Sequence, residues 1–197
     1  DNLHKGFEMQ GRCPWAGEDP LYQAYHDTEW GRPQRDGAVL FEMLILEGFQ
    51  SGLSWITILR KREGFRRVFQ GFDADVLAGW TEVDVAFALQ DPGIVRHRGK
   101  VEALVKNARA YLAMGGAEAF ASYVWAQVNG VPLQRNASSM AEVPGQTEIS
   151  QRFSKDLKRA GFGFCGPTTV YAFMQAAGLV NDHLTSCPCH AEVMRLG

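Results

Sequence analysis

The chain has 197 residues, of which 46% are hydrophobic and 21% are charged, and its formal net charge is −2. This hydrophobic content excludes a disordered chain, and no window approaches the ~18 consecutive apolar residues that a membrane helix needs. Four cysteines are too few for a disulfide scaffold of this length. We therefore expect free or metal-bound thiols in a reducing, cytoplasmic setting, with no membrane partner.

The length suits one domain of ordinary size. Residues 1–11 show no clear period and begin without methionine. We expect them to be a flexible extension or an expression remnant, with Met9 as a candidate natural start. A single helical domain is expected over residues 12–190, followed by a tail over residues 191–197.

Apolar residues recur at helical spacing through most of the chain. Between Asp36 and Phe69 the pattern is interrupted by Gly48 and Gly52, which predicts two helices or one helix with a break. Further helices are predicted over residues 83–90, 100–114, 117–128, 146–160 and 167–177. Turn residues separate these segments and no sustained strand-type alternation occurs, so we predict an all-α fold.

Positive charge is concentrated in three short clusters, within residues 60–67, 96–100 and 152–159. Each cluster alone is typical of a solvated helix face. Together they could line one phosphate-facing surface, although the net charge of −2 argues mildly against a nucleic-acid partner.

Two thiol–imidazole pairs lie at opposite ends of the chain: Cys13 with His26, and His183 with Cys187. Two sulfur and two imidazole ligands form the set of a closed tetrahedral structural zinc site, which leaves no position for a reactive water. Such a site would join the two ends of the chain. The alternative is that these are ordinary core or surface residues, and Cys189 competes with Cys187 as a ligand.

The pattern over residues 152–177 predicts a helix, a glycine-rich hairpin and a second helix. Gly161 suits a left-handed helix cap, and Pro167 suits the first turn of the following helix. An ordinary turn between helices is the alternative. However, the spacing resembles the helix-hairpin-helix element by which many DNA repair glycosylases hold the DNA backbone, because glycines and a helix N-terminus favour a phosphate. The candidate DNA contacts in this element are Gly161, Gly163, Gly166 and Thr168.

Glu47 shares its predicted helix face with apolar residues, and buried acids are rare without a partner. It is either a structural glutamate, which caps a helix or pairs with an arginine, or a carboxylate at the floor of a pocket beside Trp55. Upstream, Tyr22 and Tyr25 lie three residues apart and would project from one side of a helix. Aromatic clusters are usually core, but aromatic rings around an acid also describe a site for a flat, cationic ring.

Four segments in a fixed order carry a resemblance to a known family. They are DPLYQAYHDTEWG over residues 19–31, EGFQSGLSWI over residues 47–56, RHRGK over residues 96–100 and GLVNDH over residues 178–183. With them the chain resembles the bacterial DNA-3-methyladenine glycosylase I family, a branch of the helix-hairpin-helix glycosylase superfamily, from about residue 12 to residue 189.

The resemblance implies a helix-hairpin-helix glycosylase domain whose N- and C-terminal segments are joined by one structural Zn²⁺ per chain. The zinc ligands that it implies are Cys13, His26, His183 and Cys187. The base-binding residues that it implies are Glu47, Tyr25 and Trp55, with Tyr22, Trp15 and Trp30 near the pocket. Leu53 resembles the family's wedge residue, which fills the gap that an extruded nucleotide leaves, whereas plain core packing is the alternative for this side chain.

The activity implied is that of a DNA repair enzyme, which flips 3-methyladenine out of alkylated DNA and hydrolyses its N-glycosidic bond to leave an abasic site. A methylated base is cationic and departs neutral, so it needs little protonation. Selectivity then comes from preferring the cation through aromatic faces and the Glu47 carboxylate, which is not assigned as a nucleophile. We expect Asp182 to have a structural role and no part in the chemistry. No lysine is placed to form a Schiff base, so we expect no lyase activity.

The partners implied are double-stranded DNA containing 3-methyladenine and the free base as product ligand, and we expect a monomer in the bacterial cytoplasm. One alternative function is a non-catalytic helix-hairpin-helix DNA-binding protein with a structural zinc. Another is a zinc hydrolase, which needs three protein ligands and an open position, whereas the chain offers four.

Overall fold

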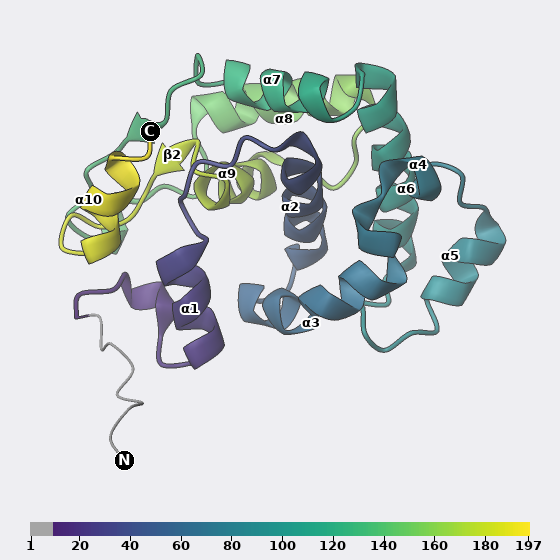
Figure 1. Ribbon diagram of the computed structural model, residues 1–197, viewed down its shortest axis with the longest axis horizontal. Coiled ribbons are helices and arrows are strands. Elements are labelled where there is room, and N and C mark those ends of the chain that lie inside the picture. The colour runs from purple at the N-terminus through teal and green to yellow at the C-terminus, as the bar shows by residue number, and fades with distance from the viewer. Residues whose placement is uncertain (1–9) are drawn as a thin grey trace.

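The computed structural model describes residues 10–197, so the proposed start at Met9 and most of the expected extension lie outside the described residues. The described chain is mainly helical, which confirms the predicted fold class (Figure 1). Its helices are α1 (Pro20–Thr28), α2 (Gly37–Gln50), α3 (Trp55–Val68), α4 (Ala74–Leu77), α5 (Glu82–Ala88), α6 (Arg98–Met114), α7 (Ala117–Ala126), α8 (Glu148–Ala160), α9 (Pro167–Ala176) and α10 (Pro188–Met194). Within residues 10–197, no helix is long and apolar enough to cross a membrane.

Helix α2 forms the centre of the molecule and packs against α3, α6, α7 and α9 (Figure 1). It is buried on almost every side, because Leu40, Phe41, Leu44 and Phe49 are each at most 2% exposed. A helix that is apolar all round belongs in a core rather than at a surface. Glu47 lies in this same buried stretch, so the core helix also carries the candidate functional acid.

The region over residues 36–69 contains two helices, as predicted, and the break falls at residues 51–54. Gly52 occupies this turn with φ +80°, a conformation that favours glycine. Gly48, by contrast, stays inside α2. A Cβ atom there would lie 3.1 Å from the carbonyl oxygen of Phe164, so its small size lets the hairpin after α8 approach the core helix. The break therefore comes from Gly52 alone.

The predicted helix-hairpin-helix is present as α8, a short hairpin and α9. Gly161 ends α8 in the left-handed conformation with φ +104°, and Pro167 is the first residue of α9, both as expected from the sequence. Side-chain and backbone groups of Thr147 and Ser150 cap the start of α8 reciprocally.

The two ends of the described chain meet on one side of the molecule (Figure 1). Strand β1 (Leu133–Gln134) pairs in parallel with β2 (Val180–Asn181), and β2 leads through residues 182–187 into α10. This arrangement brings the segment containing His183 and Cys187 against α1 and the turn before it. The loop over residues 182–187 therefore positions two of the predicted zinc ligands, His183 and Cys187, near the other two.

The close contact of α2 with α7 depends on Gly37, whose Cβ, if present, would lie 1.8 Å from the carbonyl oxygen of Ala117. We expect Gly37→Ala to lower the free energy of unfolding by about 2 kcal/mol or more, because the backbones must separate and overpacking exceeds the gain in helix propensity. Chemical denaturation monitored by circular dichroism measures this. Gly145→Ala is the control, since nothing lies within 4 Å of its Cβ position. Equal stability of the two variants would contradict the prediction.

Candidate functional site

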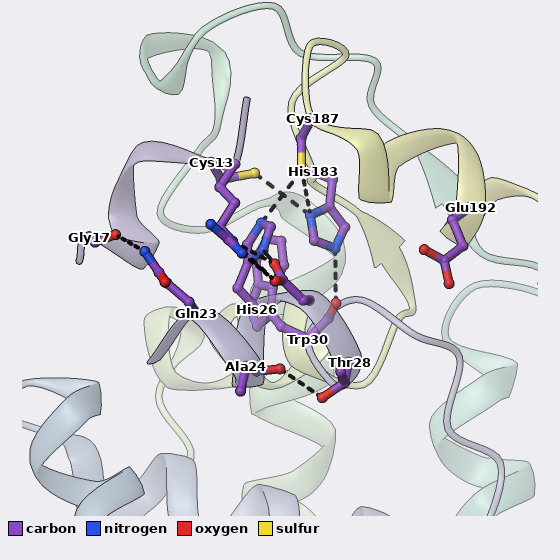
Figure 2. A network of polar contacts seen from close by, with 12 residues as sticks. Cys13, Gly17, Gln23, Ala24, His26, Thr28, Trp30, His183, Cys187 and Glu192 are labelled. Carbon is purple, nitrogen blue, oxygen red and sulfur yellow. Dashed lines mark hydrogen bonds and ion pairs between the residues drawn. The ribbon is translucent and has the colours of Figure 1, made fainter. Parts of the chain in front are cut away.

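Four side chains from the two ends of the chain converge on one point: Cys13, His26, His183 and Cys187 (Figure 2). Their ligand atoms all lie within 4.8 Å of one another, and all four residues are buried. The Sγ atom of Cys187 lies 3.6 Å from Nε2 of His26 and 3.8 Å from Nδ1 of His183. These separations suit donors placed about 2.0–2.3 Å from a common tetrahedral ion, so the cluster could hold a metal.

Outer hydrogen bonds orient both imidazoles for this role (Figure 2). Nδ1 of His26 lies 2.7 Å from a carboxylate oxygen of Asp27, and Nε2 of His183 lies 2.9 Å from the carbonyl oxygen of Trp30. If each of these nitrogens donates its proton, the other nitrogen of each ring is left with a lone pair toward the cysteines. Such second contacts usually accompany metal-ligating histidines.

Cys189, the competing ligand in the sequence, lies beside this cluster rather than within it. Its thiol forms a second, overlapping group with His26 and Asp27, whereas Cys187 belongs to the group of four. Cys187 is the N-cap of α10 and Cys189 lies in its first turn, so the two thiols start from different positions on the backbone.

The ligand cluster supports a group of aromatic rings directly. The Trp15 ring centroid lies 5.1 Å from that of His26, and the Trp30 centroid lies 4.8 Å from that of His183. Trp15 and Trp30 also meet each other edge to face, with centroids 4.8 Å apart. Gly31 permits this approach, since a Cβ at this position would lie 3.0 Å from the His183 ring.

These rings form one wall of a cavity of about 250 Å³. The candidate base-binding residues all line it, and they come from η1 (Pro14–Ala16), α1, α2, α3 and the turn after α1. They are Trp15, Tyr22, Tyr25, Trp30, Glu47 and Trp55. The fold thus brings together six residues that the sequence separates by up to 40 positions.

Glu47 is a buried acidic residue that lines this cavity. It is 5% exposed, and burial raises the pKa of its carboxyl from 4.5 to about 8. Within residues 10–197, no hydrogen-bond donor or cation is paired with it; the expected alternatives of a helix cap or an arginine partner do not occur. An unpaired buried carboxyl beside aromatic rings is a costly arrangement in the empty protein, and it favours a ligand that is cationic or donates hydrogen bonds.

The indole N–H of Trp55 is a second unsatisfied group, and sequence analysis did not identify it. Its nitrogen is buried and has no hydrogen-bond partner among the described residues. The ring itself lies 5.6 Å from that of Tyr25 and lines the cavity beside Glu47. A buried donor without a partner costs free energy that a bound acceptor would recover.

A second cavity of about 230 Å³ shares Tyr25, Glu47 and Trp55 with the first. Ion pairs neutralise the three arginines that line it: Arg32 pairs with Glu192, Arg62 with Glu29 and Arg66 with Glu42. The aromatic cavity is therefore the better binding site for a flat ring, whereas the paired charges of the second cavity leave little to recognise one.

Asp182 also reaches the aromatic cavity, but its carboxylate is fully engaged. Arg135 pairs with it at 2.9 Å, Gln175 donates to it at 2.9 Å, and the Tyr171 hydroxyl donates to it as well. A carboxylate bound by three donors orders its surroundings rather than acting as a base. These contacts agree with the structural role expected from the sequence.

The five candidate DNA-contacting residues lie outside the aromatic cavity. Leu53 is 37% exposed in the turn between α2 and α3, so it is not a core residue. The other four lie in or beside the hairpin between α8 and α9, and they are Gly161, Gly163, Gly166 and Thr168. Both elements end at the surface, and Phe164, a hairpin residue that sequence analysis did not identify, is 41% exposed there.

The chain matches the model of the methyladenine glycosylase family over residues 15–190. It is 52% identical over 180 residues to DNA-3-methyladenine glycosylase 1 of Escherichia coli strain K12, an alignment that covers 91% of this chain and 96% of the relative. A crystal structure of 3-methyladenine DNA glycosylase I superposes with a TM-score of 0.89 at 52% identity, over 91% of this chain and 99% of that one.

A tyrosine-to-phenylalanine variant of 3-methyladenine DNA glycosylase I, in complex with 3-methyladenine, superposes with a TM-score of 0.86 at 38% identity, over 90% of this chain and 96% of that one. These matches confirm the resemblance that the four sequence segments carry. The chain therefore belongs to the methyladenine glycosylase family.

Proposed function

We propose that the chain is a DNA repair glycosylase that excises 3-methyladenine from alkylated DNA. The observation that carries this proposal is Glu47, whose buried carboxyl has no partner and lines an aromatic cavity. A relative with the same fold binds 3-methyladenine, a flat base of the kind that this cavity suits. A DNA-binding module without activity has no need of such a cavity, so the catalytic function is favoured.

In the proposed reaction, 3-methyladenine in DNA carries a positive charge, and water adds to C1′ of its deoxyribose. The bond between C1′ and the base breaks, the electron pair goes to the base, and the base departs neutral. The water supplies the hydroxyl group of the abasic site and releases one proton. Because the leaving group needs no proton, Glu47 acts by favouring positive charge on the bound base and on the sugar.

Ligand charge and the protonation of Glu47 are linked. The raised pKa keeps a proton on the carboxyl of the empty protein near neutral pH. A cationic base in the cavity favours the carboxylate and lowers that pKa again. Tyr22, Tyr25 and Trp55 then hold the base by contact with their rings, and an uncharged adenine gains less from the same cavity.

The nucleotide must leave the duplex before it can reach Glu47, at a cost of a few kcal/mol. We assign Leu53 to the gap in the base stack, since it is an exposed apolar side chain in a turn next to Gln50, which lines the cavity. The hairpin over residues 161–166 and Thr168 are assigned to the DNA backbone. We assign hydrolysis without lyase activity, and among residues 10–197 no lysine lines either of the two cavities that contain Glu47.

The metal that we assign to the four-residue cluster is a single structural Zn²⁺. Two thiolates and two imidazoles are ligands that zinc prefers, and four protein ligands close the tetrahedron. The ion would stabilise the fold at the junction of the chain ends. All the chemistry of base release is assigned to the aromatic cavity, in which none of the four ligands takes part.

The first prediction concerns base release. We expect Glu47→Gln to lower the single-turnover rate of 3-methyladenine release from alkylated duplex DNA by about 100-fold, because a neutral amide cannot stabilise the positive charge. Released bases are quantified by chromatography. Glu118→Gln, at an exposed position of α7, is the matched control and should keep the full rate. An unchanged rate for Glu47→Gln would falsify the assignment.

The second prediction concerns stability. Below pH 4.5 the Glu47 carboxyl is protonated in both states, whereas between 4.5 and about 8 only the unfolded chain ionises. As the pH rises through this window, the free energy of unfolding of the wild type therefore falls by about 1.4 kcal/mol per pH unit. We expect Glu47→Gln to gain stability relative to wild type from pH 4.5 to pH 8. Denaturant titrations at several pH values measure the difference, and parallel curves would contradict the assignment of a raised pKa.

The third prediction concerns the metal. Purified protein should contain one zinc per chain, and Cys187→Ala should lose it and lower Tm by roughly 10 °C or more, since the ion's binding free energy contributes to folding. Elemental analysis and calorimetry measure both quantities. Cys189→Ala is the control, because this thiol lies outside the four-residue cluster. Loss of zinc from Cys189→Ala with retention in Cys187→Ala would reverse the ligand assignment.

A further inference from the structure

Lys100 lies in the first turns of α6, with its ammonium group buried at the end of α2. The side chain donates to the carbonyl oxygens of Phe49 at 2.9 Å and Ser51 at 2.6 Å, and the residue is 7% exposed. Lysines are seldom buried, because burial costs both hydration of the charge and side-chain entropy. Here the cation satisfies carbonyl groups at a helix C-terminus, where positive charge is favoured.

The Phe49 carbonyl lies in the last turn of α2, and the Ser51 carbonyl lies at the start of the turn that carries Leu53. Gln50 closes the same turn, because its side chain donates to the Leu53 carbonyl oxygen at 2.6 Å and its own carbonyl accepts from the Leu53 amide at 2.7 Å. Lys100 thus ties this turn, over residues 51–54, to α6. Without the cation, the hydrogen bonds between Gln50 and Leu53 would remain, but no bond from Lys100 would join the turn to α6.

The same helix also holds the hairpin. Asn107, which is 5% exposed, donates to the Gly163 carbonyl oxygen at 3.2 Å and accepts from the Gly163 amide at 2.8 Å. The His97 ring, at the start of α6, meets the ring of Phe164 edge to face, with centroids 5.9 Å apart. Both backbone polar groups of Gly163, its N–H and its carbonyl, are therefore bound by a side chain of α6.

Lys100 and Asn107 are seven residues apart, so they project from nearly the same face of α6, about 10 Å apart along its axis. One face of a single helix thus fixes both the turn that carries Leu53 and the hairpin. The RHRGK segment singled out in the sequence, residues 96–100, leads into α6 and ends at Lys100. Neither residue lines the aromatic cavity.

We propose that Lys100 and Asn107 are positioning residues, which hold the turn over residues 51–54 at a fixed distance from the hairpin so that Leu53 meets the base stack when the hairpin holds the DNA backbone. This inference rests on the proposed function, because it assigns these residues to nucleotide extrusion. Both act through other residues, since neither touches the base.

The test compares a substrate that requires extrusion with one that does not. Methylated poly(dA) is assayed annealed to poly(dT) and as the single strand, with released 3-methyladenine measured by chromatography under single-turnover conditions. We expect Lys100→Met to lower the rate on the duplex about tenfold and to change the rate on the single strand no more than about twofold, because only the duplex needs a wedge.

A double-mutant cycle then asks whether Lys100 acts through Leu53. Leu53→Ala should show the same duplex-selective loss, and adding Lys100→Met to it should lower the duplex rate no further. Arg109→Met is the control. Arg109 is also a cation of α6 that donates to two carbonyl groups, in its case those of Ala78 and Trp80. It should change neither rate. Lys100→Gln keeps an N–H donor, and we expect it to fold and to show an intermediate loss.

Equal losses on both substrates, or losses that add in the double variant, would overturn the positioning role and leave Lys100 with a stabilising role only. A wild-type protein that releases 3-methyladenine from neither substrate would overturn the proposed function, and this inference with it. The wild-type rate on the single strand therefore separates the two failures.

Discussion

The convergence of Cys13, His26, His183 and Cys187 is the contact on which the candidate site depends. Two of these ligands come from the start of the chain and two from its end, and the rings of Trp15 and Trp30 rest on the imidazoles. Neither ring is part of the main core around α2. Trp15 packs instead against a smaller hydrophobic cluster that includes Cys13, Leu184 and Cys187. A bound ion would give this peripheral cluster the rigidity that its small apolar area cannot provide.

The side of the cavity that carries Glu47 differs, because it is formed by α2, the central helix of the main core. Glu47 and Leu44 are neighbours on α2, and the acid remains buried with no partner among the described residues. Stability alone would favour an apolar residue at this position. Under the proposed function, this arrangement suits the binding of a charged base, since a carboxyl that is already dehydrated interacts strongly with a cation. The protein would then give up stability at this position in return for recognition.

Much of the fold could be predicted from the sequence because the long helices have strong apolar periodicity. The two helices within residues 36–69, the left-handed cap at Gly161 and the start of α9 at Pro167 were all predicted correctly. Short elements could not be predicted, because α4 has four residues and each strand has two, too few to show a period. Gly48 was misleading for a tertiary reason, since only the approach of Phe164 explains a glycine inside a helix.

The residues of the candidate site, too, could be predicted only in part from the sequence. Side chains with a distinctive type, such as the cysteines, histidines and Glu47, could be selected from the sequence, and the aromatic residues followed from their clustering. The roles of individual residues in catalysis and DNA contact stay predictions. Groups whose importance lies in a missing or distant partner could not be found in this way. The unsatisfied indole N–H of Trp55 and the buried ammonium of Lys100 depend on what folding brings near them. The carbonyl groups that Lys100 binds are 51 and 49 residues away in the sequence.

The sequence separation of the metal-ligand cluster has a kinetic consequence. Cys13 and His183 are 170 residues apart, and His26 and Cys187 are 161 apart. Closing so large a loop costs entropy that only a nearly complete fold recovers, so we expect these contacts to form late in folding. Interactions that are absent from the folding transition state slow unfolding without accelerating folding. An ion at this junction would therefore prolong the lifetime of the native state, and a chain whose ends are held in this way resists opening even where its equilibrium stability is modest.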